Sequence, residues 1–295
     1  MPNTVSQLIE MYRNDPQSSF RKLSHGVRVK HERLLTRIMR EHGERSLKGI
    51  RARDLFAWHD GWLGKGKIAA AHSLISRLRV VIRFGATVLE DKECRRLAER
   101  LGEMRFERPV PRRRTLSSEQ VRLIRVKARE WFGWPSIALA QAFQFDLRLN
   151  QKAVIGEWVP ADEAEPSDVT RKTDDREEKW VRGLRWSDLD EAFVLRHISG
   201  KRGLELQFDL KNAAMVMEEL AIYAQTSIEE LTRAHLPSKG PIITNDITAL
   251  PFSTAEFRRK WRKVANQAGI PAQVMNMDSG KPSQFDPRQF RRVSA

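Results

Sequence analysis

Apolar residues recur at helical spacing through the first hundred residues. Between residues 27 and 40, lysines and arginines fill one face, and the apolar positions on the other are Val27, Leu34, Leu35, Ile38 and Met39. A short helix is expected after Ser46 and a longer one from Ile68 to Leu89, with glycines at 61, 64 and 66 breaking the pattern between them. Because no strand-like alternation occurs here, the pattern predicts an all-α region of three or four helices.

A basic, proline-containing segment separates this region from the rest of the chain. Residues 107–115 read ERPVPRRRT, a composition typical of an extended and solvated linker. We therefore expect a helical domain over residues 1–106, a linker over 107–115 and a second domain over 116–295.

The second domain mixes helical and strand patterns. Ser117 or Ser118 is a candidate N-cap for a first helix, and a second helix is predicted from Ser136 to Gly156. Strand-like runs at 193–198 and 205–210 flank a Gly-containing turn, which predicts a hairpin, and further helices are expected at 213–224 and 253–269. The chain is therefore predicted to be mainly α with a small antiparallel β-sheet, in the α+β class.

One stretch of the second domain differs in composition. Residues 160–180 are crowded with Asp, Glu, Pro and Thr and contain almost no large apolar side chain before Trp180. This composition predicts an acidic, mobile surface insertion.

Charge narrows the class of partner. The 295 residues carry a formal net charge of +15, which attracts polyanions. The lysines and arginines are spread through periodic segments, so a folded nucleic-acid groove is favoured over a membrane-surface or ribosome anchor. The single cysteine, Cys94, and the scattered histidines offer no zinc-ligand spacing, and no apolar run approaches the ~20 residues of a membrane span. We expect a cytoplasmic protein with no metal, no cofactor and no membrane association.

Several basic side chains are candidates for contacts with double-stranded DNA. The turn over residues 61–66 places two lysines before a helix that would enter a major groove with its N-terminus first. A second basic face, made of Lys30, Arg33 and Arg37, lies on the helix predicted over residues 27–40. The linker arginines at 112–114 would follow the DNA backbone, so that two domains clamp the duplex. The candidates are Lys65, Lys67, Ser73, Arg77, Lys30, Arg33, Arg37, Arg112, Arg113 and Arg114. Trp58 and Trp62, one helical turn apart, are expected in the core and not as platforms for bases.

Three stretches of the second domain share an order with one enzyme family. They are ALAQAFQFDLRLNQKAVIGEW at 138–158, GLRWSDLD at 183–190 followed by VLRHISGKRGLELQFDL at 194–210, and FSTAEFRRKWRKVANQAGIP at 252–271. They resemble the first catalytic arginine segment, the lysine-bearing hairpin and the helix before the His-x-x-Arg box of the tyrosine recombinases, the phage-integrase family. The resemblance implies a SAM-like helical core-binding domain followed by a mixed catalytic domain.

The family's chemistry, if it applies, assigns roles to two residues. In the family a tyrosine hydroxyl attacks a DNA phosphodiester to form a 3′-phosphotyrosyl bond, with no metal or ATP. The resemblance implies that Arg148 clamps the phosphate, that Lys201 protonates the leaving oxygen, and that copies of the chain assemble on DNA. From the residues alone, a solvated or salt-bridged surface arginine on an amphipathic helix is the favoured interpretation of Arg148, and an ordinary solvated turn residue is the default interpretation of Lys201.

The sequence departs from the family pattern at several positions. Asp146 stands where the family has Gly, Gln151 where it has Glu, and Met277-Asp278-Ser279-Gly280 where it has the His-x-x-Arg box. Arg288, Arg291 and Arg292 could supply a guanidinium in its place. Only Tyr12 and Tyr223 are tyrosines, both expected in the core. The expectation is a C-terminally truncated or frame-shifted recombinase that is inactive by itself.

Two functions remain open. The first is a recombinase-family enzyme for DNA integration or excision, without its last catalytic segment. The alternative is a non-catalytic DNA-binding regulator or a competitor for recombination sites. A third possibility, an RNA-binding protein, is disfavoured because no RNA-recognition motif or aromatic-studded sheet is present.

Overall fold

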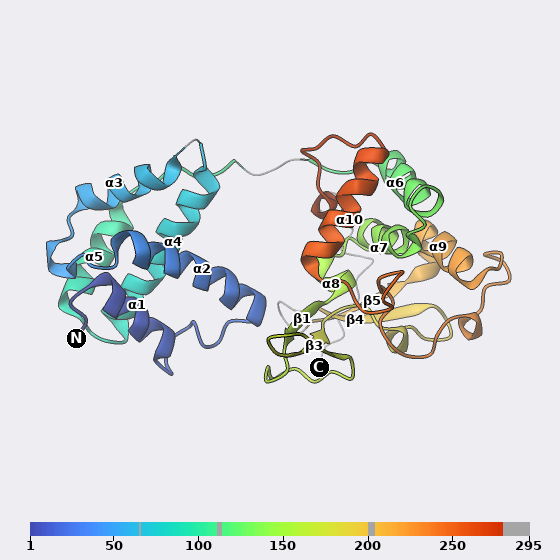
Figure 1. Cartoon of the computed structure of the whole chain (residues 1–295), viewed down its shortest axis with the longest axis horizontal. Helices are drawn as coiled ribbons and strands as arrows, with labels where there is room; N and C mark the ends of the chain where they lie inside the picture. The colour runs from blue at the N-terminus through green and yellow to red at the C-terminus, as the bar shows by residue number, and fades with distance from the viewer. Residues whose placement is uncertain (65, 111–113, 200–203, 280–295) are drawn as a thin grey trace. The chain divides into compact units, whose positions relative to one another are not determined.

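The computed structural model describes residues 1–64, 66–110, 114–199 and 204–279. The chain divides into two compact units, Met1–Arg112 and Arg113–Ala295, and this division point falls within residues 107–115 (Figure 1). Each unit has its own buried apolar cluster, so each is described by itself.

The named secondary-structure elements of the first unit, among its described residues, are all helices. Its elements are α1 (Val5–Asn14), α2 (His25–His42), the short 3-10 helix η1 (Leu47–Gly49), α3 (Ala52–Leu63), α4 (Ile68–Thr87) and α5 (Lys92–Glu103). Helix α4 packs against α1, α2, α3 and α5 and is therefore the central helix of the unit. Apolar residues one and two turns apart line its buried faces, among them Leu74, Ile75, Leu78, Val81 and Ile82.

The expectation of three or four helices was too low, because the described residues of this unit form five α-helices. The sequence pattern missed α5, which is mostly charged and buries only Cys94, Leu97 and Leu101. Asp91 caps this helix by accepting from the Cys94 amide at 2.8 Å. The narrow apolar stripe is enough to pack α5 against α4.

Trp58 and Trp62 are core residues, as the sequence predicted. Their side chains are 5% and 2% exposed. The His42 ring stacks on Trp58 at 4.1 Å between centroids, and the Trp62 indole N–H donates to Glu41 Oε2 at 2.6 Å. Neither indole face is left open for a base.

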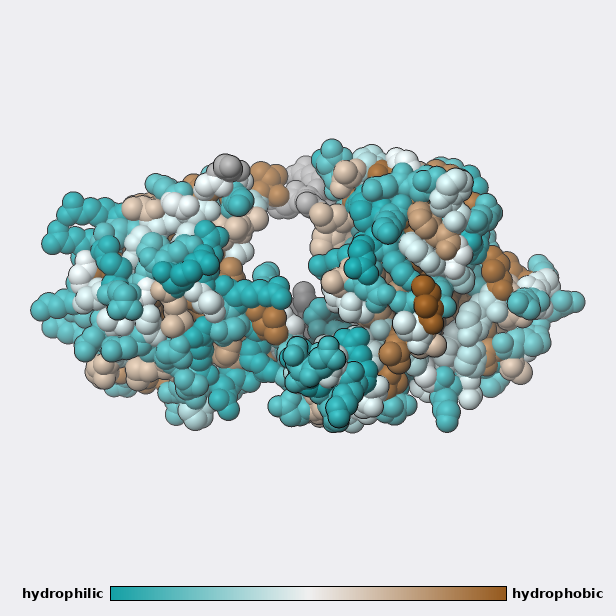
Figure 2. All heavy atoms as spheres, in the orientation of Figure 1, coloured by the Kyte–Doolittle hydropathy of each residue, from teal (hydrophilic) through white to brown (hydrophobic). Residues whose placement is uncertain are grey.

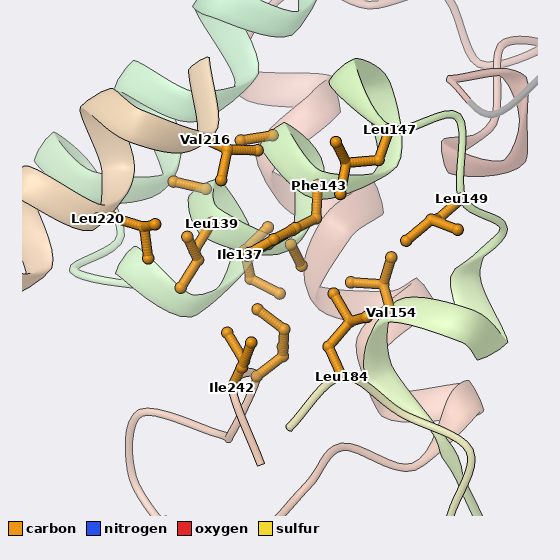
Figure 3. Close-up of a cluster of buried hydrophobic side chains, with 14 of the residues drawn as sticks. Ile137, Leu139, Phe143, Leu147, Leu149, Val154, Leu184, Val216, Leu220 and Ile242 are labelled. Carbon is orange, nitrogen blue, oxygen red and sulfur yellow. The ribbon is translucent and has the colours of Figure 1, made fainter. Parts of the chain in front are cut away.

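The second unit is built around one buried helix. Its helices are α6 (Ser118–Glu130), α7 (Pro135–Asp146), α8 (Gln151–Ile155), α9 (Ala214–Ala224) and α10 (Thr254–Gln267). Every residue from Ile137 to Gln144 of α7 is buried, and α7 contacts the other four helices. Figure 3 shows side chains of α7, including Phe143, clustered with Val216 and Leu220 of α9 and Val154 of α8.

The single helix predicted from Ser136 to Gly156 was wrong. The chain forms α7, leaves helical geometry at Leu147–Asn150, and begins again as α8. Arg148 has φ of 55°, in the left-handed region, and Asn150 caps α8 by accepting from the Ala153 amide at 3.2 Å. The apolar spacing continued through the break and concealed it, because Leu147 and Leu149 are both buried.

The segment predicted to be a mobile insertion, residues 160–180, contains regular structure. These residues take part in a three-stranded antiparallel sheet in the order β1 (Glu157–Pro160), β3 (Glu177–Val181) and β2 (Thr170–Lys172). Glu178 is buried and paired with Arg171 at 2.6 Å and Arg176 at 2.7 Å. The cross-strand pair of Arg171 with Glu178 and the buried side chain of Trp180 stabilise this sheet.

The predicted hairpin is present as β4 (Val194–Ser199) and β5 (Leu204–Asp209), paired antiparallel. Short 3-10 helices complete the described chain: η2 (Trp186–Asp188), η3 (Leu210–Asn212), η4 (Arg233–His235) and η5 (Asn276–Asp278). The predicted N-cap Ser117 is confirmed by a capping box with Gln120. The α+β class with small antiparallel sheets is therefore confirmed.

Hydrophilic residues cover much of the visible face of both units (Figure 2). Within the described ranges, no helix combines the length and apolar character needed to cross a membrane.

Candidate functional site

Arg148 lies in the loop between α7 and α8, not on a helix as predicted. Its guanidinium Nη1 donates to the Ser279 carbonyl oxygen at 3.2 Å, and its Cζ lies 4.5 Å from the centroid of the Phe145 ring. Burial lowers the pKa of Arg148, and the nearby charge of Asp146 opposes that shift. The side chain is half-buried, so an anion that reaches it would meet a partly desolvated cation.

Asp146, which replaces the family's glycine, has a structural role. Its Oδ2 accepts from the amides of Met215 at 2.9 Å and Val216 at 3.1 Å. These are donors of the first turn of α9, which has no side-chain cap of its own. The carboxylate therefore joins the end of α7 to the start of α9 and fixes the loop that carries Arg148.

Gln151, which replaces the family's glutamate, connects three elements beside Arg148. Its Oε1 accepts from Asn276 Nδ2 at 2.9 Å and from Arg258 Nε at 3.1 Å, and its Nε2 faces the Thr254 carbonyl at 3.4 Å. An amide can both donate and accept here, whereas a carboxylate could not donate. We call Arg148, Gln151, Arg258, Asn276 and Ser279 the Arg148 cluster.

Sequence reasoning missed part of this cluster. It singled out the basic helix at 252–271 and the change to Gln151, but not Asn276. Asn276 lies in η5, in a short polar segment with no periodicity, and its burial to 5% exposure depends on α8 and α10. No local pattern in the sequence marks such a residue.

Lys201 lies outside the described residues, between β4 and β5 in the sequence. The two strands that flank it pair in register from Val194 with Asp209 to Ser199 with Leu204. The hairpin predicted to carry this lysine is therefore present, and the catalytic role of Lys201 stays a prediction.

The two tyrosines differ from each other. Tyr12 is 1% exposed, between the rings of Phe20 and Phe84, as predicted for a core residue. Tyr223 is 49% exposed, so its predicted place in the core was wrong. It lies near the end of α9 with one face against Trp186, at 5.4 Å between ring centroids. The apolar neighbours Leu220 and Ala221 are buried while Ile222 and Tyr223 face outward, because these positions fall on different sides of the helix.

The first unit brings several predicted DNA-binding residues together on α2 and α4. Nη2 of Arg77 on α4 lies 2.6 Å from Nε2 of His31 on α2. Burial, then the charges of Arg77 and Lys30, lower the pKa of His31 to about 4. The ring is therefore neutral at physiological pH and accepts from Arg77. The charge of Lys30 reaches His31, and Arg33 is the helical neighbour of Lys30 three residues on; both are exposed on α2. We call Lys30, Arg33 and Arg77 the α2–α4 basic face.

The other predicted DNA-binding residues differ in their exposure and in their partners. The guanidinium of Arg37 is paired with Glu41 at 2.9 Å, and the Ser73 hydroxyl donates to the Ala69 carbonyl at 2.7 Å. Lys67 is exposed at the start of α4, and Arg114 is exposed after the division between units. Three further candidates, Lys65, Arg112 and Arg113, lie outside the described residues.

These two units, in this order, define a class of protein. A helical unit is followed by a mixed unit with an arginine-bearing loop after its central helix, a β-hairpin and a basic helix, and this is the tyrosine recombinase fold. The chain matches a lambda integrase tetramer bound to a Holliday junction with a TM-score of 0.67 and 13% identity, over 97% of this chain and 75% of that one.

Two further solved structures agree. A lambda integrase dimer bound to a COC′ core site gives a TM-score of 0.65 at 14% identity, over 94% of this chain and 68% of that one. The Tn1549 transposon integrase in complex with circular intermediate DNA gives a TM-score of 0.59 at 10% identity, over 95% of this chain and 85% of that one. No protein-family model and no curated protein matches the sequence. The resemblance found in the sequence is thus confirmed at the level of the fold.

Proposed function

We propose that this chain binds double-stranded DNA as a tyrosine-recombinase-like protein and assembles on it with further copies of itself. The observation that carries the proposal is the α2–α4 basic face on a fold whose matched structures are DNA complexes with dimeric and tetrameric integrases. A net charge of +15 supports it, because cations on a folded surface release counterions from the duplex when they bind phosphates.

We also propose that this chain does not cleave DNA through a tyrosine of its own. Tyr12 is buried in the first unit, and its hydroxyl lies 3.2 Å from Ser19 Oγ. Tyr223, the other tyrosine given in the sequence, lies on α9 with its ring beside Trp186. These observations favour the alternative function, a non-catalytic regulator or a competitor for recombination sites, for this polypeptide.

The binding proposal is tested with charge-matched variants of the full chain. Fluorescence anisotropy with a labelled duplex compares wild type with Lys30→Ala/Arg33→Ala and with Lys48→Ala/Arg53→Ala, a control with equal charge loss on exposed residues outside the α2–α4 basic face. We expect the first variant to bind at least about tenfold more weakly, since each lost phosphate contact costs about 1 kcal/mol or more. Equal affinities of the two variants would contradict the assigned face.

The cleavage proposal is tested by covalent trapping. The chain is incubated with a pool of nicked duplexes of randomised sequence and analysed on a denaturing gel. We expect no protein–DNA adduct. An adduct that persists after Tyr223→Phe would exclude this tyrosine as nucleophile, and an adduct lost in that variant would identify Tyr223 as one; either would overturn the non-cleaving function.

A further inference from the structure

A basic pocket in the first unit lies apart from the α2–α4 basic face. It has a volume of about 210 Å³ and lies between α4, α5 and the segment after α5. Its charged and aromatic lining consists of His72, Arg79, Arg83, Arg105, Phe106 and Arg108. One water molecule needs ~30 Å³ or less, so the pocket has room for a polyatomic ion.

The charge of this pocket is uncompensated. Among the described residues, none of the four arginines forms an ion pair with a carboxylate, and no acidic residue lines the pocket. Burial lowers the pKa of Arg79, and the charges of Arg105, Arg108 and Arg83 lower it further. The three other arginines therefore make the charged form of Arg79 less favourable, and an anion bound among them would offset this effect.

Arg79 alone has a structural explanation. Its Nη2 donates to the carbonyls of Leu101 at 3.0 Å and Met104 at 2.9 Å, at the end of α5. These carbonyls have no partner within the helix, so a cation there stabilises its C-terminus. Its Cζ also lies 5.2 Å from the centroid of the Phe106 ring.

That explanation does not cover the rest of the pocket. Arg83 and Arg108 are exposed and donate to no other group that the structure describes, and Arg105 reaches only the Gly102 carbonyl, at 3.2 Å. Nε of Arg79 and Nδ1 of His72 are buried with no hydrogen-bond partner among the described residues. Arginine N–H groups without a described acceptor and a buried imidazole nitrogen without a partner therefore line one pocket.

We propose that this pocket binds a phosphate group. Guanidinium forks match the tetrahedral oxygens of phosphate, and several arginines can share one group. The inference deepens the proposed function, because the expected source is a backbone phosphate of the bound duplex. The pocket would then seat that phosphate beside residues 105–108, where the chain leaves the first unit.

The test uses the full chain and two variants with equal charge loss. Arg83→Ala/Arg108→Ala removes two pocket arginines with no structural bond, and Lys92→Ala/Arg95→Ala removes two exposed cations of α5 that do not line the pocket. Affinity for a labelled duplex is measured across a range of KCl concentrations. Thermal unfolding is followed with inorganic pyrophosphate and, separately, with succinate.

We expect the pocket variant to lower the slope of log affinity against log salt by about one or more relative to the control, since each phosphate contact contributes about 0.9. We also expect pyrophosphate to raise the unfolding temperature of wild type and of the control, but not of the pocket variant. Stabilisation by pyrophosphate with unchanged DNA slopes would support the phosphate site and assign it to a free phosphate compound.

Identical behaviour of the two variants in both measurements would overturn the proposal, as would stabilisation by succinate equal to that by pyrophosphate. If wild type binds no duplex, the proposed function fails, and the pyrophosphate measurement still decides whether the pocket binds phosphate.

Discussion

At the end of α7, Asp146 and Arg148 are separated by one residue and are both partly removed from water. Burial raises the pKa of Asp146, and the amides of Val216 and Met215 and the charges of Arg125 and Arg148 oppose the shift. Burial lowers the pKa of Arg148. For both groups the effect of burial on the pKa is larger than the opposing effect of nearby charges and hydrogen bonds. Keeping both groups ionised in this loop therefore costs free energy that their hydrogen bonds only partly offset.

The raised pKa of Asp146 leads to a pH-dependent prediction for Asp146→Asn. Because folding raises this pKa above its ordinary value of 3.8, the folded chain binds the proton more tightly than the unfolded chain does. Ionisation at neutral pH therefore destabilises the fold, whereas asparagine keeps an acceptor oxygen and carries no charge. We expect Asp146→Asn to be more stable than wild type at pH 7, with the gain shrinking as pH falls through the raised pKa towards 3.8.

Urea unfolding of both proteins at several pH values between 7 and 4 measures this difference in stability. Hydrogen exchange of the α9 amides is a second measurement of the same difference. Asp175→Asn, on an exposed residue, is the control and should show little change at any pH. If the stability gained by Asp146→Asn grew as the pH fell, the raised pKa assigned to Asp146 would be contradicted. Asp146→Gly, the family's usual residue, removes the acceptor and should instead cost about 1 kcal/mol.

At the scale of elements, the side chain of Trp180 in β3 contacts the end of α8, and Lys152 of α8 also pairs with Glu157 of β1. The Trp180 indole N–H donates to the Ile155 carbonyl at 2.8 Å, and the ring lies against Gly156 and Gly183. Gly156 has φ of 71°, where other residues are strained. Because glycine has no Cβ, the backbone at these two positions approaches the indole ring closely, and the sheet packs against the helical core.

We therefore predict that Gly156→Ala destabilises the second unit by more than about 2 kcal/mol. A Cβ at this position would lie 2.2 Å from Trp180 Nε1 and 2.7 Å from the Val181 carbonyl oxygen. Hydrogen exchange in β1 and β3 should accelerate most. Gly102→Ala in α5 is the matched control, because a Cβ added there would meet no described atom within 4 Å, and it should be neutral or stabilising by up to about 1 kcal/mol. Equal effects of the two substitutions would rule out the close approach.

The same elements show what the sequence could predict. The hairpin β4–β5, helices α9 and α10 and the cap at Ser117 follow from local alternation, periodicity and capping chemistry, and all were predicted. The break at Arg148 and the sheet at 157–181 depend on partners distant in sequence, namely Met215 and Val216 for Asp146 and Ile155 for Trp180. The motif singles out Arg148 as a candidate, but its hydrogen bond to Ser279 could not be predicted, because the two residues lie 131 positions apart.

At the scale of the molecule, basic residues occur in both units. Lys30, Arg33 and Arg77 lie in the first unit, as do the arginines of the pocket beside α5, and the Arg148 cluster lies in the second. A duplex that engaged both units would displace more counterions than one bound to either unit alone. The dependence of affinity on salt is therefore the measurement that reports on the whole chain.

We predict a steep salt dependence for the binding of a duplex by the full chain. Six to ten phosphate contacts would reduce affinity by about 10³-fold or more between 50 and 200 mM salt. Anisotropy titrations in KCl without divalent cations, which would compete for phosphates, measure this slope. A single strand of equal length is the comparison and should give a shallower slope, near 0.7 instead of 0.9 per contact. A slope corresponding to only two or three contacts would show that one unit alone engages DNA, and the α2–α4 basic face variants would then identify whether that unit is the first.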